Sequence, residues 1–176
     1  NVGARCNLAC AHCHVEAGPH RTEAMDRATF EAVLAVAARP GIDTVDVTGG
    51  APVMNPHFAW FIEQASRVAR VMVRTNLVIL RDPSCAPLVD RYAELGVEVV
   101  ASLPNVHAAQ AEQQRGNATF DPSLAVLREL NARGYGRDGY RGDRGSDRGN
   151  GRGYGERNQN RFGGSRGGCR GGRGDR

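Results

Sequence analysis

The sequence predicts an α/β protein whose residues 1–133 hold three to four parallel strands, in an open sheet or in a partial, TIM-like (βα) barrel. Strand patterns alternate with helical patterns along this stretch, and strands that are each followed by a helix pair in parallel through right-handed crossovers. The composition changes at residue 134. The last 43 residues hold 16 of the 23 glycines and 11 of the 23 arginines, so we expect a disordered, Gly/Arg-rich tail over residues 134–176.

The first helix and strand are predicted by a cap, an apolar period and a turn. Asp26 is a typical N-cap residue, and Pro40-Gly41 ends the helix. The apolar positions between them follow the 3.6-residue period: Phe30, Val33, Leu34 and Ala37. The sequence TVDVT (44–48) then indicates a short strand that runs into GGAP (49–52).

The next elements repeat this alternation. Asn55-Pro56 predicts a cap and the first position of a second helix, and Asp121-Pro122 opens the last one. A third helix over residues 85–95 stops at Gly96. The strands between them are VARVMVRTN (68–76) and VEVVASLP (97–104). Polar residues therefore stand at successive strand ends, where chemistry gathers in parallel α/β folds.

Three of the five cysteines lie in the stretch RCNLACAHCH (5–14), with the spacing Cys6-x3-Cys10-x2-Cys13. Two short gaps let three thiolates converge on one small object from a single loop. Ordinary ferredoxin sites supply four cysteines to each cubane cluster. Three thiolates leave one iron open, so that a substrate or cofactor can bind that iron directly.

Other interpretations of these cysteines stay open. CAHCH matches the c-type haem attachment pattern, which needs an exported protein and leaves Cys6 unused. A zinc site formed by Cys6, Cys10, Cys13 and His14 is chemically reasonable, although structural zinc sites usually draw their ligands from two separated pairs. Free buried cysteines are the third alternative, but these three follow no apolar helical or strand pattern.

Composition also bears on location. No run approaches the roughly 18 apolar residues needed to cross a bilayer, and no secretory signal precedes the cysteines. The cysteine count is odd, which disfavours a complete disulfide framework. We therefore expect a cytoplasmic protein with reduced thiols and no membrane partner. The chain starts at Asn1 rather than Met, which suggests a piece of a longer protein.

The stretch CNLACAHC (6–13) resembles the cluster loop of radical S-adenosylmethionine (radical SAM) enzymes. Later segments resemble the family's Gly-Gly motif, its following strands and its Arg-Gly segment, in the family's order: VDVTGGAP, VMVRTN, VEVVASLP and residues 114–134. The resemblance covers residues 1–135 and is narrowest to the arsenosugar-biosynthesis radical SAM proteins, also called radical SAM/Cys-rich domain proteins. It implies a radical SAM barrel, with a core at residues 1–133 that is incomplete at both ends.

The resemblance also implies cofactors and their ligands. A [4Fe–4S] cluster would be held by Cys6, Cys10 and Cys13, and its open iron would bind S-adenosylmethionine (SAM). Reductive cleavage would then give a 5′-deoxyadenosyl radical, with electrons from a flavodoxin or ferredoxin. The narrower family implies a small-molecule substrate, a methylated trivalent arsenical that receives the adenosyl group.

Six further residues are implied as SAM contacts, and no residue is assigned a chemical step. Gly49 and Gly50 would let the backbone approach the SAM amino group, and His12 would lie beside the adenine. Asn76 and Ser102 would bond the ribose or carboxylate, and Arg115 would pair with the carboxylate. Each also has a plainer interpretation as a turn glycine, a loop cap, a strand-end hydroxyl or a solvated charge.

A second function class remains, a non-catalytic metal-binding or RNA-associated protein. The tail segment SRGGCRGGRG is typical of RGG-type low-complexity sequence, and the tail's aromatic residues are available for base stacking: Tyr135, Tyr140, Tyr154 and Phe162. A change of reading frame in a G+C-rich gene would also produce such a tail. A partial barrel exposes a strand edge and lacks part of the wall that would surround a substrate. This chain would therefore be inactive on its own if the missing strands are essential.

Overall fold

The computed structural model describes residues 1–136. The predicted tail starts at residue 134, but Tyr135 packs against the core and its hydroxyl donates to Val97 O at 2.8 Å, so the prediction that this ring is available for base stacking was wrong. The rest of the predicted tail, residues 137–176, lies outside the described range. Three parallel strands form one sheet with β2 (Arg70–Thr75) between β1 (Thr44–Val47) and β3 (Glu98–Ala101). Val45 aligns with Val71, and Val73 aligns with Val99. The predicted α/β class and parallel pairing are confirmed, and all three strands lie where the sequence indicated them.

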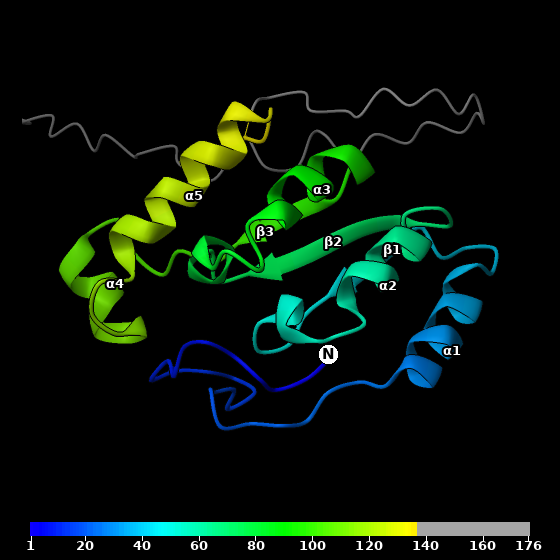
Figure 1. Cartoon of the computed structure of the whole chain (residues 1–176), viewed down its shortest axis with the longest axis horizontal. Coiled ribbons are helices and arrows are strands. Elements are labelled where there is room, and N and C mark those ends of the chain that lie inside the picture. Colours follow the sequence, from blue (N-terminus) through cyan, green and yellow to red (C-terminus); the bar gives the residue numbers. More distant parts are fainter. Residues whose placement is uncertain (137–176) are drawn as a thin grey trace, which may run out of the picture. The chain divides into compact units, whose positions relative to one another are not determined.

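The described residues form five α-helices. One helix precedes β1, one follows each of the first two strands, and two follow β3: α1 (Arg27–Ala37), α2 (Phe58–Ala65), α3 (Pro87–Leu95), α4 (Ala108–Arg115) and α5 (Phe120–Ala132). Two 3₁₀ turns, η1 (Pro52–Met54) and η2 (Val78–Arg81), follow the first two strands. Figure 1 shows this alternation along the chain. No helix among residues 1–136 is long and apolar enough to cross a membrane.

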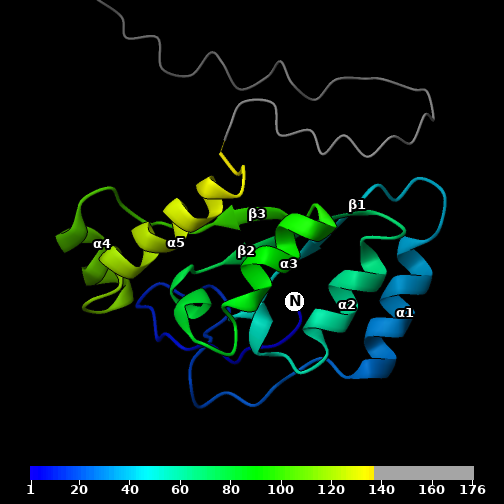
Figure 2. The ribbon, with the colours of Figure 1, turned by 45° about the horizontal axis from the view of Figure 1, so that its top comes forward.

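The core lies on one face of the sheet. Along β2, Val71 and Val73 are buried while Arg70 and Arg74 are exposed, as expected when alternate side chains point to opposite faces. Helices α2 and α3 lie on the buried side, in front of the strands in Figure 2. Fully buried side chains of α1, α2 and α3 pack together in the core: Phe30 from α1, Phe58, Phe61 and Ile62 from α2, and Tyr92 from α3.

Two helix ends have the cap residues that the sequence predicted, the start of α1 and the end of α3. Asp26 precedes α1, and its carboxylate accepts a hydrogen bond from Thr29 N at 2.8 Å. Gly96 ends α3 in the left-handed conformation, with φ of 65°, which glycine adopts without strain.

The prediction for Asn55-Pro56 was wrong. Helix α2 begins at Phe58, and Asn55 is instead a buried connector. Its amide nitrogen donates to Val2 O and Met25 O, both at 2.9 Å, and its amide oxygen accepts from His57 N at 2.8 Å. A buried amide with three such partners stabilises the chain more as a bridge than as a cap.

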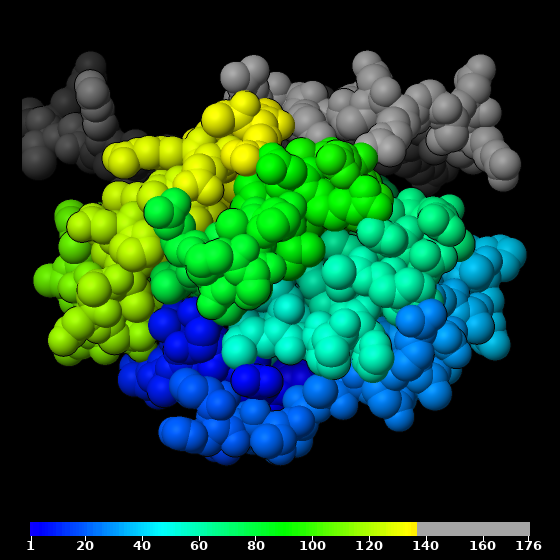
Figure 3. Space-filling model, in the orientation of Figure 1, coloured from blue at the N-terminus to red at the C-terminus, as the bar shows by residue number. Residues whose placement is uncertain are grey.

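The N-terminal segment, residues 2–5, runs beside the chain that leaves β1. Val2 N donates to Thr48 O, Gly50 N to Gly3 O, and Ala51 N to Arg5 O, all at 2.9 Å. These bonds hold the start of the cysteine segment (residues 6–14) beside the chain that leaves β1. In Figure 3 the dark-blue residues, which include the cysteine segment, lie between the yellow-green residues around α4 and the cyan residues around η1.

We predict that Asn55→Ala lowers the free energy of unfolding by about 2–3 kcal/mol, because it strips buried main-chain groups of their partner. Asn105→Ala is the matched control, since Asn105 is only partly buried and its side chain accepts one bond, from His107 N at 2.9 Å. Urea denaturation followed by circular dichroism measures both variants. Equal losses of stability would contradict the bridging role of Asn55.

Candidate radical SAM site

The ends of the three strands surround a cavity of about 340 Å³, a volume within the usual range of small-ligand sites. All nine residues proposed from the sequence line it: Cys6, Cys10, His12, Cys13, Gly49, Gly50, Asn76, Ser102 and Arg115. They come from five separate segments of the chain. Their convergence follows from the parallel sheet, which gathers the carboxyl ends of its strands at one edge.

Gly49 and Gly50 form the junction between β1 and the cysteine segment. A Cβ atom on Gly50 would lie 2.4 Å from Arg5 O and 2.9 Å from Ala4 O, which real Cβ atoms do not tolerate. Gly49 has φ of 154°, and a Cβ there would lie 2.7 Å from Gly3 O. The pair therefore lets two stretches of main chain approach closely beside the cavity.

The three cysteine thiols differ in burial and partners. Cys6 is buried, whereas Cys10 and Cys13 are half-buried. The Cys13 sulfur accepts from Ala17 N at 3.2 Å, and the Cys6 sulfur accepts from Leu8 N at 3.5 Å. Both sulfurs thus lie within hydrogen-bonding distance of a main-chain N–H group of the same loop.

The guanidinium of Arg115 interacts with two of these cysteines, Cys10 and Cys6. Burial raises the pKa of the Cys10 thiol, the nearby Arg115 lowers it in part, and Cys6 and Cys13 add to the rise. Burial likewise lowers the pKa of Arg115, while Cys10 and Cys6 raise it. Arg115 donates to Asn76 O at 3.0 Å. The three thiols and this arginine thus form one electrostatic unit in a partly desolvated space.

The remaining predicted residues lie around this unit. His12 and Ser102 are exposed at the cavity wall, and Ser102 N donates to Thr75 O at 2.9 Å. The side chain of Asn76 is buried and turned toward Cys6 and Asn7. Its amide group is therefore already engaged by the protein.

Sequence reasoning missed several residues of this cavity, among them Arg74 and Gln114. Arg74 forms a two-pronged ion pair with Asp46 of β1, with a shortest distance of 2.7 Å. Gln114 O accepts from Ala11 N at 3.0 Å, which joins α4 to the cysteine segment. The alternation of side chains along β2 could have predicted the position of Arg74, because it places Arg74 on the face of the sheet opposite the buried Val73.

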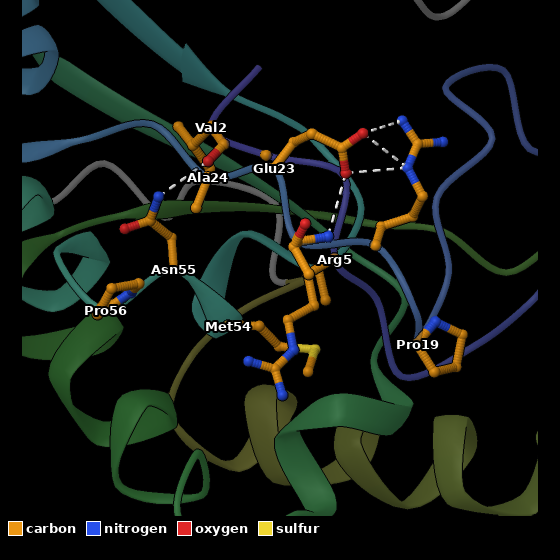
Figure 4. Close-up of a pocket in the computed structure, with 12 residues that line it drawn as sticks. Val2, Arg5, Pro19, Glu23, Ala24, Met54, Asn55 and Pro56 are labelled. Atoms are coloured by element: carbon orange, nitrogen blue, oxygen red, sulfur yellow. Dashed lines mark hydrogen bonds and ion pairs between the residues drawn. The ribbon is translucent and has the colours of Figure 1, made fainter.

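A second cavity, of about 320 Å³, lies on the other side of the N-terminal segment, between residues 19–24 and 51–56. Figure 4 shows Asn55 bonded to Val2 at one end and Arg5 beside Met54 at the other. None of the nine predicted residues lines it, and it contains no cysteine or histidine. The chemistry of metal and cofactor binding therefore points to the cysteine cavity.

The family model of the radical SAM superfamily matches residues 1–142. The chain belongs to the radical SAM superfamily. Members of this superfamily are enzymes that use a [4Fe–4S] cluster and SAM. The match confirms the broader resemblance stated from the sequence, while the arsenosugar subgroup rests on that resemblance alone.

Curated radical SAM relatives include a probable GTP 3′,8-cyclase of Methanopyrus kandleri, 36% identical over 83 residues, which are 47% of this chain and 27% of that protein. The Bacillus subtilis subtilosin biosynthesis protein AlbA is 26% identical over 132 residues, 74% of this chain and 29% of that protein. The chain therefore spans less than a third of the length of these relatives.

Solved structures share the radical SAM fold. Streptococcus suis SuiB bound to S-adenosylmethionine superposes with a TM-score of 0.63 at 19% identity, covering 75% of this chain and 30% of SuiB. SuiB bound to its precursor peptide SuiA also gives a TM-score of 0.63, at 20% identity, with 75% and 29% coverage.

The donor set of this chain, three cysteines that line one cavity, fits the superfamily's cluster. Among residues 1–136, no three cysteine, histidine or carboxylate side chains surround a common point closely enough to hold one ion. A zinc site needs four donors at about 2.0–2.3 Å from one metal. The cysteines of a cubane each bind a different iron, so three sulfurs spread around one cavity suit the larger group.

We predict that Gly50→Ala destabilises the chain by about 1–3 kcal/mol, because the added methyl group overpacks the junction with Arg5. Gly18→Ala is the control, since a Cβ at Gly18 meets no atom within 4 Å and such substitutions usually stay within about 0.5 kcal/mol. Urea unfolding of both variants gives the comparison. A Gly50→Ala variant as stable as Gly18→Ala would show that the two segments are not in close contact.

Proposed function

We propose that this chain provides the cofactor-binding part of a radical SAM enzyme, in which Cys6, Cys10 and Cys13 hold a [4Fe–4S] cluster. The observation that carries this proposal is the convergence of all nine predicted residues on one cavity at the strand ends. The cluster, when bound, supplies one electron that cleaves the sulfonium bond of SAM to methionine and a 5′-deoxyadenosyl radical.

The chain's own residues bind, orient and shield the cofactors in this proposal. The glycine junction presents main chain to the SAM amino group, because no Cβ blocks the approach at Gly49 and Gly50. Arg115 already lies beside Cys10, where its charge suits both a thiolate-rich cluster and the SAM carboxylate. Holding the sulfonium against its electron donor is chiefly an orientation effect.

The walls of the cavity complete the SAM site. His12 is exposed and lines the cavity beside Cys13, which suits a flat ring packed on adenine. Ser102 and Asn76 stand at the ends of adjacent strands, and Ser102 has its side chain exposed. We assign Ser102 to the ribose or carboxylate of SAM. The engaged amide of Asn76 suits a role toward the cluster instead.

For the substrate, we propose a methylated trivalent arsenical that receives the adenosyl group on arsenic. The support is the resemblance of residues 1–25 and of TGGAPVMNPHF (48–58) to the arsenosugar-biosynthesis proteins. The curated relatives compared with this chain have other names, two GTP 3′,8-cyclases and a subtilosin biosynthesis protein, and do not support an arsenical substrate. We place the enzyme in the cytoplasm, with a flavodoxin or ferredoxin as electron donor.

We predict that anaerobic reconstitution gives about four irons per chain and that the dithionite-reduced protein converts SAM to 5′-deoxyadenosine. Variants Cys6→Ala, Cys10→Ala and Cys13→Ala should lose the cluster and at least about 100-fold of this product, because removing a ligand costs more than the roughly 10–100-fold loss typical of its outer-shell partners. Cys85→Ala is the control, because Cys85 is buried outside the cavity. Iron analysis and chromatography of the products measure the outcome.

Uptake of zinc without 5′-deoxyadenosine would instead support a non-catalytic metal-binding protein. The substrate is tested in the same samples. With a methylated trivalent arsenical present, an adenosylated arsenical should form and 5′-deoxyadenosine should fall. Unchanged 5′-deoxyadenosine with no arsenical product would reject this substrate while leaving the cofactor assignment intact.

A further inference from the structure

Asn76 lies at a turn whose backbone geometry is costly for the residues that form it. Leu77 has φ of 68° and ψ of −49°, and Val78 N donates to Asn76 O at 2.8 Å. This is a γ-turn with a positive central φ, a rare and strained form. The leucine is fully buried, so the surrounding contacts must hold it in this unfavourable conformation.

The strained turn fixes where Asn76 points. Thr75 Oγ1 accepts from Leu77 N at 3.0 Å, and Asn76 Oδ1 accepts from Ile79 N at 3.1 Å. With its oxygen held this way, the amide nitrogen faces the cysteine segment. It donates to Asn7 Oδ1 at 2.8 Å and to Cys6 Sγ at 3.5 Å.

These two bonds use both hydrogens of the Asn76 amide nitrogen. Asn7 is itself beside the thiol, since its Oδ1 lies 3.9 Å from Cys6 Sγ. The main-chain oxygen of Asn76 also accepts from Arg115, at 3.0 Å. One residue therefore connects the buried thiol of Cys6 with the cation that lies beside Cys10.

We infer that Asn76 is a positioning residue for the cluster, which it serves by donating an N–H···S hydrogen bond to Cys6 and by holding Asn7. This inference rests on the proposed function, because it needs Cys6 to be a cluster ligand. Hydrogen bonds to cysteine sulfur are among the features that set the reduction potential of an iron–sulfur cluster. A donor stabilises the extra electron, so Asn76 raises the potential and eases reduction of the bound cluster.

The test replaces the donor without changing the shape. Asn76→Asp keeps the oxygen that Ile79 N needs and removes the amide hydrogens that face Cys6. We expect the reconstituted variant to keep its cluster and to have a lower midpoint potential. The ratio of reduced to oxidised cluster at a fixed potential should fall about tenfold or more, which corresponds to about 59 mV for one electron. Electrochemical titration followed by electron paramagnetic resonance measures it.

Two further variants separate this effect from others. Asn76→Ala removes the donor without adding a charge, and its potential should move in the same direction. Asn131→Asp adds the same charge on the exposed surface of α5 and should leave the potential unchanged. Circular dichroism and urea unfolding report whether each variant folds. Folded Asn76 variants with the wild-type potential would overturn the inference, and folded variants that keep the cluster at a lower potential would support it.

A metal-free measurement keeps the inference separate from the proposed function. In the ¹⁵N-labelled chain without cluster, the side-chain amide resonances of Asn76, identified by their absence in Asn76→Asp, should shift in Cys6→Ser and not in Cys13→Ser. Rapid solvent exchange of these hydrogens and no response to Cys6→Ser would overturn the contact even if the chain binds a cluster. If the wild type binds no cluster but this response is seen, the proposed function fails while the contact stands.

Discussion

The close approach of residues 3–5 to residues 50–51 is the constraint on which the rest of the site depends. Two main-chain hydrogen bonds join these stretches, from Gly50 N to Gly3 O and from Ala51 N to Arg5 O. They form only because position 50 lacks a Cβ. The junction fixes where Cys6 and the loop after it begin, beside the end of β1, and contacts of Asn76 and Gln114 hold the loop further along.

The cavity built on this junction combines thiols with a cation. Its lining includes the three cysteines, Arg115 and polar residues at the strand ends. Partial burial of Cys10 and Arg115 strengthens their interaction, because electrostatic attraction grows as solvent is excluded. Asn76 connects Cys6 with Arg115 through its side chain and its main-chain oxygen. Three thiols and a cationic guanidinium thus lie within one small space, which suits the proposed cofactor pair.

Much of this site could be predicted because its residues follow local rules. The spacing of Cys6, Cys10 and Cys13 predicts a shared ligand, and apolar alternation locates the strands whose ends carry Gly49, Asn76 and Ser102. Parallel pairing then requires these ends to meet, which the cavity confirms. The roles of the nine residues stay predictions, since proximity alone does not identify a bound molecule.

The features that escaped prediction depend on tertiary contacts. Helix α4 has one buried residue, Ala111, so its sequence lacks an apolar stripe, and contacts of Gln114 and Arg115 hold it. Asn55 looks like a helix cap from sequence, but its partners include Val2, 53 positions away. The direction of Asn76 depends on a positive φ at Leu77, which no propensity of leucine indicates.

The central claim is that three thiols hold one cluster whose open iron binds SAM directly. Electron–nuclear double resonance of the reduced wild-type chain with SAM labelled with ¹⁷O in its carboxylate tests this claim most directly. The account predicts a hyperfine coupling between the cluster spin and the labelled oxygen, which disappears when SAM is omitted. A reduced cluster that shows no coupling to labelled SAM at saturating concentration would contradict it.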